Sequence, residues 1–432
     1  MIFIGLRKSD RFDLEAVEMS VRAAAHQMGA KILEELLRAQ ESFQRQRPCE
    51  CGQTARFYQM RPRKILTAVG SVRFERPYYL CPSCHQGQSP RDVELDVVDT
   101  EFSPGVRRML ALVGSNGSFA QGREQLEALA GLNITTKAVE RQAEAIGGDI
   151  AAGEHAEKQR ALQLELPTVT GPEIPVLYIE MDGTGVPMVT AETEGRVGKI
   201  VGERARTREA KLGCVFTQTR VDEKGRPVRD EASTTYTGAI ETAEEFGVRL
   251  YHEVWQRGWS RAKRKVVLGD GAPWIWNLAD EHFPGATQIV DLYHARQHLW
   301  ELAAKLYPAN PAQRKAWVWR LQRKLDAGRI ESLVAELGRF ATADRHVQEQ
   351  IRIEREYFSH NAHRMRYPIF RKQHLFIGSG VIEAGCKTII GSRLKQSGMF
   401  WTLRGANAIL ALRANRLSGR FEQYWENRAR AA

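Results

Sequence analysis

The segment that decides the fold is Val176-Leu-Tyr-Ile-Glu-Met-Asp182, which is followed directly by Gly183-Thr-Gly-Val-Pro-Met188. An unbroken apolar run of this length is typical of a buried central strand. When such a strand ends in an acid followed by glycine, it delivers a carboxylate to the rim of a sheet, where a ligand can reach it. The simpler alternative is a turn, because Asp-Gly is a common turn pair. Asp182 is therefore a candidate catalytic residue that the rest of the chain has to support.

A second buried segment, Lys265-Val-Val-Leu-Gly-Asp270, repeats the pattern of an apolar run that ends in Asp-Gly. Around these two segments the chain alternates strand and helix signals in the order βββ-α-β-α-β-α. With acids at the ends of its first and fourth strands, this is the ribonuclease H arrangement, an α/β fold with a mixed five-stranded sheet. The first and fourth strands lie side by side in that fold, so the two acids meet. We place the strands at 176–182, 185–190, 211–218, 265–270 and 287–291, and the helices at 239–255, 274–281 and from 294 onward.

A third carboxylate follows a long stretch that is helical and basic. The segment 377–390 predicts a helix that is capped at Ser379 and carries Glu383 near its start. Asp182, Asp270 and Glu383 thus come from three separate elements. Carboxylate oxygens suit hard ions such as Mg²⁺ or Mn²⁺, and two ions about 4 Å apart can activate an attacking oxygen and stabilise the leaving one in phosphodiester displacement. We therefore predict a site for two divalent ions.

Three further side chains lie close to these acids in the sequence. Glu180 shares a face with Asp182 under the two-residue period of a strand, so it either reaches the metal ions or accepts a hydrogen bond from a neighbour. Arg393 and Lys395 follow Glu383 and are placed to hold DNA phosphates, with a solvated helix face as the alternative.

Four of the six cysteines form two close pairs, one spaced CxC and one CxxC. In a reducing compartment, close pairs are more typical of metal ligands than of disulfides. Residues 67–80 between the pairs predict a β-hairpin that turns at 70–71 and brings the pairs together, as in a zinc ribbon. Because CxC departs from the usual CxxC, reduced thiols remain the alternative to a structural zinc ion, and His85 could replace one cysteine. The predicted zinc ligands are Cys49, Cys51, Cys81 and Cys84.

The other amino-terminal segments are helical. Residues 13–46 predict one long helix for packing or dimerisation. Residues 119–129 predict a helix, 131–133 a turn, and the capping-box pattern at 136–140 a second helix that ends near 146. This pattern fits a DNA-binding helix-turn-helix, and a plain helical hairpin fits it as well. The basic residues that favour DNA are Arg123, Lys137 and Arg141.

Composition narrows the class of protein. The chain has 432 residues, 43% of them hydrophobic, which indicates about three domains. It has no apolar run long enough for a membrane span, and its start is charged too early for a signal peptide, so we expect a cytoplasmic, nucleoid-associated protein. Lys and Arg number 63 against 52 Asp and Glu, a balance that favours a polyanionic partner, with nucleic acid the first choice.

Five segments between residues 182 and 387 resemble one protein family, and the resemblance covers nearly the whole chain, including the cysteine pairs. They are Asp182-Gly-Thr-Gly-Val-Pro-Met188, Ala210-Lys-Leu-Gly-Cys-Val-Phe-Thr-Gln218, Val267-Leu-Gly-Asp-Gly-Ala272, Asp291-Leu-Tyr-His-Ala-Arg-Gln-His298 and Gly380-Val-Ile-Glu-Ala-Gly-Cys-Lys387. In these segments the chain resembles the ISKra-type insertion-sequence transposases, relatives of the Mutator-like DDE superfamily. The resemblance implies a ribonuclease H-like catalytic domain, interrupted by a helical insertion before the last acid, and transposition by metal-dependent strand cleavage and joining.

The same resemblance implies roles for single residues. Asp182 and Asp270 match the first two catalytic aspartates, and Glu383 matches the closing glutamate. Asp291-Leu-Tyr-His294 resembles the superfamily's Asp/Cys-x-x-His motif, so His294 either positions a phosphate or leaving group, or takes part in an Asp–His hydrogen bond that caps the helix. The implied partners are double-stranded DNA, as terminal inverted repeats and target, and further copies of the chain in a homodimer or higher oligomer.

We expect five regions along the chain. They are an N-terminal helix (1–47), a zinc-ribbon-like module (48–100), a helix-turn-helix-like DNA-binding region (101–165), a ribonuclease H-like catalytic domain (175–300 and 376–420) and a basic α-helical insertion (301–375).

Three functions compete on this sequence. The first is a DNA transposase that binds transposon ends and uses the acidic triad for hydrolysis and strand transfer. The second is a nuclease of the same fold that cuts DNA without joining it. The third is a non-catalytic DNA-binding regulator that retains the zinc ribbon and helix-turn-helix, against which the presence of all three acids counts.

Overall fold

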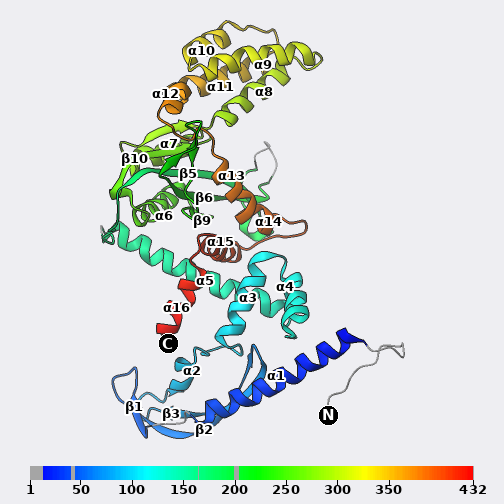
Figure 1. Cartoon of the computed structure of the whole chain (residues 1–432), viewed down its shortest axis with the longest axis vertical. Helices are drawn as coiled ribbons and strands as arrows, with labels where there is room; N and C mark the ends of the chain where they lie inside the picture. Colours follow the sequence, from blue (N-terminus) through cyan, green and yellow to red (C-terminus); the bar gives the residue numbers. More distant parts are fainter. Residues whose placement is uncertain (1–12, 40–43, 164, 199–203, 432) are drawn as a thin grey trace. The chain divides into compact units, whose positions relative to one another are not determined.

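The structure is a computed structural model that describes residues 13–39, 44–163, 165–198 and 204–431. The chain forms two compact units. The first comprises Met1–Ile146 together with Phe421–Ala432, and the second comprises Gly147–Arg420 (Figure 1). In the described part of the chain, no helix combines the length and apolarity that a membrane span requires.

A five-stranded mixed sheet forms the centre of the second unit, with strand order β11-β10-β5-β6-β9. β10 and β11 run parallel to β5, whereas β6 is antiparallel to β5 and β9 is antiparallel to β6. β5 is paired on both edges, and its apolar residues are buried because helices cover both faces of the sheet. On one face the Tyr178 ring stacks on Phe216 with 4.8 Å between ring centroids. The strands are β5 (Ile174–Pro187), β6 (Thr207–Gln218), β9 (Thr235–Ala239), β10 (Ala262–Gly269) and β11 (Thr287–Val290).

The strand predictions need two corrections. The predicted strands at 176–182 and 185–190 are one continuous strand, because β5 stays paired with β6 through Asp182↔Leu212 to Pro187↔Thr207. Asp182 therefore lies within the strand, not at its end. The third strand of the sheet is β9, in a region whose helix was predicted to begin at 239. The predicted order βββ-α-β-α-β-α is kept, because β5, β6 and β9 are still three strands that precede the first helix of the domain.

Helices cover both faces of this sheet. Successive residues of a strand face opposite sides of the sheet, so Leu212 and Gly213 of β6 face two different layers of helices. A Cβ added to Gly213 would contact the side chain of Leu250 in α6 (Ala243–Gln256). A Cβ added to Gly385 in α13 (Gly380–Gly385) would contact the side chain of Leu212. Asp182 pairs directly with Leu212 and so faces the layer of α13. The other covering elements are α7 (Pro273–His282), the π-helical segment Cys386–Gly391, α14 (Ser392–Leu394) and α15 (Leu403–Leu417), which packs on β9.

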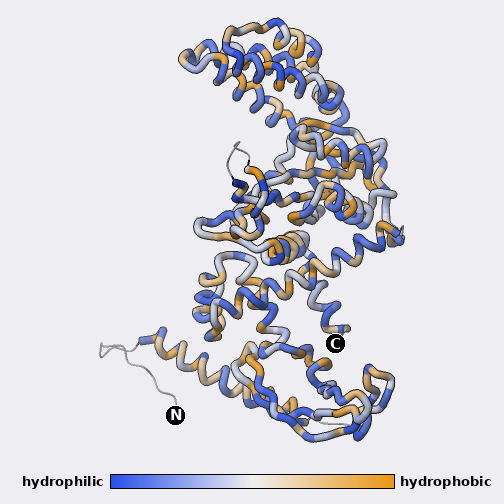
Figure 2. The backbone as a smooth tube through the Cα atoms, turned by 180° about the vertical axis from the view of Figure 1, so that it is seen from behind, coloured by the Kyte–Doolittle hydropathy of each residue, from blue (hydrophilic) through white to orange (hydrophobic). Residues whose placement is uncertain are grey.

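A helical segment follows β11, as the sequence predicted. It begins with α8, whose first turn lies at the sheet, and its helices have a buried apolar stripe of their own that includes Trp317, Leu321, Leu333 and Phe358. Hydrophilic and hydrophobic residues alternate along these helices in Figure 2, as amphipathic packing requires. The helices are α8 (Leu292–Leu306), α9 (Pro311–Asp326), α10 (Ile330–Arg339), α11 (Arg345–His360) and α12 (Tyr367–Lys372).

The first unit contains a long β-hairpin and several helices. The hairpin is confirmed, but its turn is at residues 68–69, because Thr67 pairs with Gly70 and the Thr67 hydroxyl donates to the Gly70 carbonyl at 2.7 Å. The elements are α1 (Leu14–Ala39), β1 (Gln46–Pro48), β2 (Thr54–Thr67), β3 (Gly70–Leu80), β4 (Gly87–Gln88), α2 (Pro90–Glu94), α3 (Pro104–Asn116), α4 (Phe119–Gln125), the π-helical segment Leu126–Ala130, the start of α5 (Thr136–Leu162) and α16 (Phe421–Ala431).

Two predicted helix ends differ from the structure. α1 ends at Ala39, and Gln46 belongs to β1, so the helix predicted for 13–46 is too long; residues 40–43 lie outside the described part. α5 does not end near 146 but continues to Leu162, although Gly147 and Gly148 weaken a helix. The helix is retained there because α15 packs directly against it: an added Cβ on Gly147 would lie 2.1 Å from the Ala408 carbonyl oxygen.

The two adjacent glycines of α5 give a matched stability test. We expect Gly147→Ala to lower the free energy of unfolding by about 1–3 kcal/mol, because the new methyl group forces α5 away from the α15 backbone. Gly148→Ala is the control, since an added Cβ there meets no atom within 4 Å and should stabilise the helix by about 0.5–1 kcal/mol. Thermal or denaturant unfolding of the full chain measures both. Equal effects of the two substitutions would contradict the packing described here.

Candidate functional site

Asp182 and Asp270 lie next to each other because of the pairing between β10 and β5. These parallel strands are in register at Leu268↔Glu180, so two residues farther on Asp270 comes level with Asp182. β10 ends at Gly269, which leaves that edge of β5 open beside the half-buried Asp182. Burial raises the pKa of the Asp182 carboxyl, and the negative charge of Asp270 raises it further. Two carboxylates therefore meet at one opening in the sheet edge.

The turn that carries Asp270 is fixed by its own side chain and by the helical segment. Asp270 Oδ1 accepts the backbone N–H of Ala272 at 2.8 Å, and Gly271 has a φ of +102° that favours glycine. The Tyr357 hydroxyl of α11 donates to the Asp270 carbonyl at 2.9 Å. A Cβ on Gly271 would lie 2.5 Å from the Tyr357 ring, so glycine also permits this close contact.

Glu383 is on α13, the helix over the face to which Asp182 points. α13 approaches the sheet closely, since an added Cβ on Gly385 would lie 2.6 Å from the Tyr236 ring. One turn beyond Glu383, the Cys386 thiol interacts with the Asp182 carboxylate. Glu383 itself is exposed, and its Oε1 lies 3.4 Å from the hydroxyl of Ser379. The helix thus contacts the strand that carries Asp182, while the Glu383 carboxylate stays open to solvent.

The three acids form an open arrangement. In the described part of the chain, only the cysteine cluster brings three or more His, Cys, Asp or Glu ligand atoms close enough together to hold a metal ion. The carboxylates of Asp182, Asp270 and Glu383 do not all lie that close together. Mg²⁺ keeps several of its waters and accepts one or two carboxylates. The donor set of Asp182, Asp270 and Glu383 is chemically appropriate for such ions.

His294 lies in the first turn of α8, near Asp182. Asp291 caps this helix, because its Oδ1 accepts the backbone N–H groups of Tyr293 at 2.5 Å and His294 at 2.9 Å. The cap uses the backbone N–H of His294, so the imidazole can interact with other groups. A positive charge on this imidazole would lower the pKa of the Asp182 carboxyl. His294 is half-buried.

Sequence reasoning missed a group of side chains that extends this site into the helical segment. His298 lies one turn after His294, with 5.4 Å between ring centroids. Its Nδ1 is 2.7 Å from Glu354 Oε2, and its ring stacks on Tyr357 at 4.0 Å. The spacing of four residues between the two histidines could have identified His298, but no local signal links it to α11.

The predicted DNA-contacting residues have different environments. Lys395 is exposed, and its Nζ donates to the Thr184 hydroxyl at 2.9 Å, two residues from Asp182 on the same strand. Arg393 is completely buried over the Trp401 ring, so we do not retain it as a DNA contact. In the first unit, Arg123 pairs with Glu124 and Glu127, Lys137 pairs with Glu140, and Arg141 is exposed.

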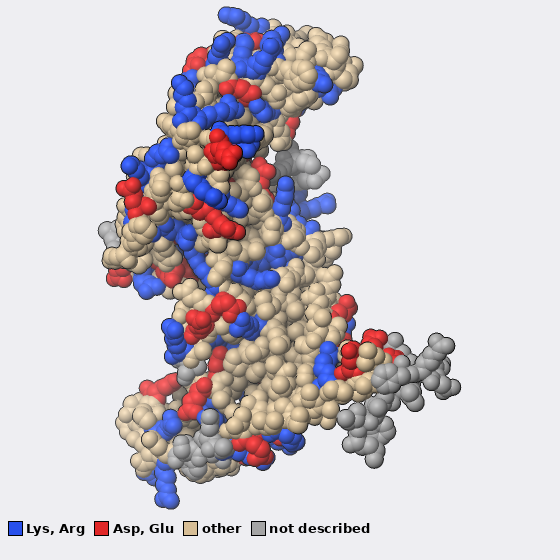
Figure 3. Space-filling model, viewed as in Figure 1, with Lys and Arg blue, Asp and Glu red and all other residues tan. Residues whose placement is uncertain are grey.

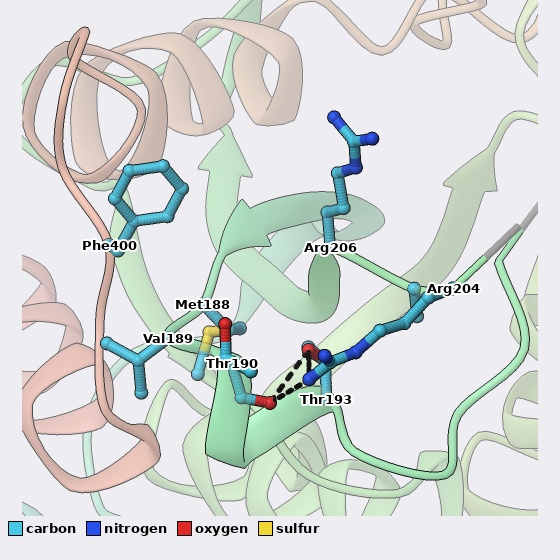
Figure 4. Close-up of a pocket in the computed structure, with 8 residues that line it drawn as sticks. Met188, Val189, Thr190, Thr193, Arg204, Arg206 and Phe400 are labelled. Carbon is cyan, nitrogen blue, oxygen red and sulfur yellow. Dashed lines mark hydrogen bonds between the residues drawn. The ribbon is translucent and has the colours of Figure 1, made fainter.

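A cavity of about 590 Å³ lies beside the end of β5 beyond Asp182. Phe400, 65% exposed, forms one wall, and Arg206 extends at the opposite side (Figure 4). The Arg204 guanidinium donates to the Thr190 carbonyl and to the Thr193 hydroxyl. The cavity therefore combines an exposed aromatic ring with two guanidinium groups. It is lined by Met188, Val189, Thr190, Thr193, Arg204, Ala205, Arg206 and Phe400.

Basic side chains are not confined to this cavity. On the face shown in Figure 3, Lys and Arg side chains are numerous over the helical segment that follows β11, with acidic side chains among them. Several of these cations are paired: Arg320 and Lys324 share Glu336, and Arg366 pairs with Glu331. The surface is therefore basic but partly neutralised.

The four predicted cysteines of the first unit come together. The β2–β3 hairpin brings the two pairs side by side, and all four sulfur atoms lie within 4.8 Å of one another. Cys49 Sγ is 3.6 Å from Cys84 Sγ, and Cys51 Sγ is 3.7 Å from Cys81 Sγ. Zn–S bonds of about 2.3 Å in a tetrahedron place sulfur atoms about 3.8 Å apart, so the cluster fits a zinc ion.

The thiols of the cluster differ in pKa. Backbone N–H groups of Cys84 and Ser83 lower the pKa of the Cys81 thiol to about 6, whereas burial and the neighbouring cysteines raise the pKa of the Cys49 and Cys84 thiols. The CxC pair is accommodated by Gly52, whose φ of +81° lets its N–H donate to the Cys49 carbonyl at 2.9 Å. The short spacing, which put the site in question from sequence, is therefore compatible with four sulfur ligands.

Zinc content tests the cysteine cluster directly. We expect one zinc ion per wild-type chain and a loss of at least about 90% of it in Cys81→Ser, because one missing thiolate opens a closed structural site. Cys214→Ala is the control, since Cys214 is buried in β6 and should leave the zinc content unchanged. Elemental analysis of the purified proteins gives the stoichiometry. A metal-free wild-type protein with four titratable thiols in the cluster would contradict the assignment.

Comparison with known proteins gives a family but no activity. No curated protein matches the chain. Among solved structures it has a weak likeness to the "Drosophila P element transposase strand transfer complex", with 9% sequence identity and a TM-score of 0.19 over 71% of this chain and 84% of that one. The model of the uncharacterised protein family UPF0236 matches residues 7–429, and the chain accordingly belongs to that family.

Proposed function

We propose that this chain is a DDE-type DNA transposase of the ISKra kind, which cuts and joins DNA strands with divalent metal ions. The observation that carries the proposal is the register of two parallel strands, which brings Asp182 level with Asp270, beneath the helix that bears Glu383. Three carboxylates from three elements, accessible at one edge of a sheet, are what metal-dependent phosphodiester chemistry needs.

The sheet topology supports a ribonuclease H-like catalytic domain. Three antiparallel strands, β5, β6 and β9, are followed by the parallel strands β10 and β11, and the second acid follows a strand next to the first acid's strand. We propose that residues 175–300 and 376–420 form this domain, with the helical residues 301–375 as an insertion. Tyr357 and Glu354 of that insertion contact the site, so we propose that it helps to shape the catalytic centre.

Each residue of the site has a proposed role. Asp182, Asp270 and Glu383 would hold two Mg²⁺ or Mn²⁺ ions, which would supply activation of the attacking oxygen and stabilisation of the leaving oxygen. His294 would provide a hydrogen-bond donor to a phosphate or leaving group beside Asp182. Tyr357 keeps the backbone of Asp270 in place through its hydroxyl.

DNA would contact both units. In the second unit, Lys395 donates to Thr184, which lies two residues along β5 from Asp182, and Arg204 and Arg206 line the cavity beyond the end of β5, so a DNA strand on this path would meet three cations. We propose that the zinc-ribbon-like hairpin of the first unit and the helix-turn-helix-like region 101–165, in which Arg141 is exposed, recognise the terminal repeats. We propose that two or more copies act together, one at each end of the element.

Substitution of the three acids tests the proposed chemistry. Asp182→Asn, Asp270→Asn and Glu383→Gln should each reduce Mg²⁺-dependent cleavage of DNA that contains the element's ends by about 100-fold or more, because each removes one charged ligand of the ions. Glu281→Gln, at an exposed acid of α7, is the control and should cleave as the wild type does. Gel assays measure cleavage and joining, and mobility shifts measure end binding, which all variants should retain.

The outcomes separate the competing functions. Full cleavage by any one of the three variants would contradict the triad. Cleaved ends that are never joined would indicate a nuclease of the same fold, and end binding without any metal-dependent cleavage by the wild type would indicate a non-catalytic regulator.

A further inference from the structure

Two carboxyl groups near the proposed catalytic acids are completely buried. Glu180 and Asp291 are each 0% exposed, whereas Asp182 is half-buried and Glu383 is exposed. A buried carboxyl group is costly unless it is hydrogen-bonded. The partners of Glu180 and Asp291 therefore indicate what these two groups are for.

Glu180 caps a helix from a neighbouring strand. Its Oε2 accepts the backbone N–H of Ile382 at 2.9 Å, and this N–H belongs to the first turn of α13, where no helical partner exists. The sequence predicted that Ser379 caps this helix, but Ser379 makes no side-chain cap. Glu180 of β5 takes over that role and joins α13 to the strand that carries Asp182.

Asp291 connects α13 to a second element. While its Oδ1 caps α8, its Oδ2 accepts both the backbone N–H and the hydroxyl of Ser379, each at 2.5 Å. The adjacent backbone adds a further link, because the Leu292 N–H donates to the Ile377 carbonyl at 2.9 Å. The residues just before α13 are thus held by the start of the helix that carries His294.

Only one of the two Glu180 carboxyl oxygens takes part in the attachment. Oε2 accepts the Ile382 N–H, whereas Oε1 has no hydrogen-bond partner among the described residues. Glutamine has nearly the same shape as glutamate and presents one side-chain oxygen that can accept the Ile382 N–H. Glu180→Gln therefore preserves this hydrogen bond, and Glu180→Ala removes it.

We propose that Glu180 and Asp291 are positioning residues that fix the first turn of α13 to β5 and to α8, and so set the position of the Glu383 carboxylate relative to Asp182 and Asp270. In this arrangement neither Glu180 nor Asp291 is a metal ligand. The effect of this attachment on catalysis rests on the proposed function, whereas the attachment of α13 itself rests only on the hydrogen bonds described above.

Hydrogen exchange of the full chain tests the attachment without any assay of activity. Glu180→Ala and Asp291→Ala should each speed amide exchange in the segment 380–385 about tenfold, which corresponds to the loss of one or two buried hydrogen bonds. Glu180→Gln should exchange as the wild type does. Asp344→Ala is the matched control, because Asp344 caps α11 through two N–H groups but holds no second element.

Cleavage assays then separate a positioning role from metal binding. Glu180→Gln should keep wild-type cleavage within about threefold, because the amide oxygen preserves the cap, whereas Glu180→Ala should lose about tenfold. Unchanged exchange in Glu180→Ala would overturn the proposal, and so would a Glu180→Gln variant that is as inactive as Glu383→Gln. If the wild type cuts no DNA, the proposed function fails, and the exchange results still decide the attachment.

A milder variant keeps the test available if the alanine variants do not fold. Ser379→Ala deletes only the hydroxyl that donates to Asp291 and leaves both buried acids in place. It should speed exchange in 380–385 severalfold, because this hydroxyl no longer ties the start of α13 to Asp291. Wild-type exchange in Ser379→Ala would overturn the role of Asp291.

Discussion

The in-register parallel pairing of β10 with β5 is the constraint on which the candidate site depends. Strand residues alternate between faces, so a shift of one residue would turn one aspartate away from the other. The pairing Leu268↔Glu180 prevents this and places Asp270 level with Asp182. The site is therefore a consequence of strand registry, and the buried apolar residues of both strands, including Val267 and Ile179, are what hold that registry.

The acids around this edge divide by burial into two groups with different tasks. Asp182 and Asp270 are half-buried and Glu383 is exposed, so their carboxylate oxygens can exchange contacts with water for contacts with a metal ion. Glu180 and Asp291 are fully buried and are bonded to the start of α13 and, for Asp291, of α8. A sequence motif cannot distinguish these groups, because a strand face presents Glu180 and Asp182 alike. The difference arises only when α13 covers one of them and leaves the other at the open edge.

The sequence predicted the order of strands and helices in the sheet, because an apolar run indicates a buried strand from local residues alone. It could not predict that β5 continues past Asp182, since that depends on pairing with β6, which is distant in the chain. It predicted Ser379 as a cap, whereas Glu180 supplies one from a strand about two hundred residues earlier. Tyr357 and His298 were missed for the same reason. The cysteine pairs were found because their spacing is local, but their 3.6–3.7 Å contacts required the hairpin.

The central claim is that Asp182, Asp270 and Glu383 hold divalent ions at the open edge of β5. The most direct measurement is a crystal structure of the chain with end DNA and Mn²⁺, in which anomalous scattering locates the ions. The account predicts Mn²⁺ bound by all three carboxylates, with Glu180 and Asp291 outside its coordination sphere. Anomalous peaks that lie away from these acids, or Mn²⁺ coordinated by Glu180, would contradict it.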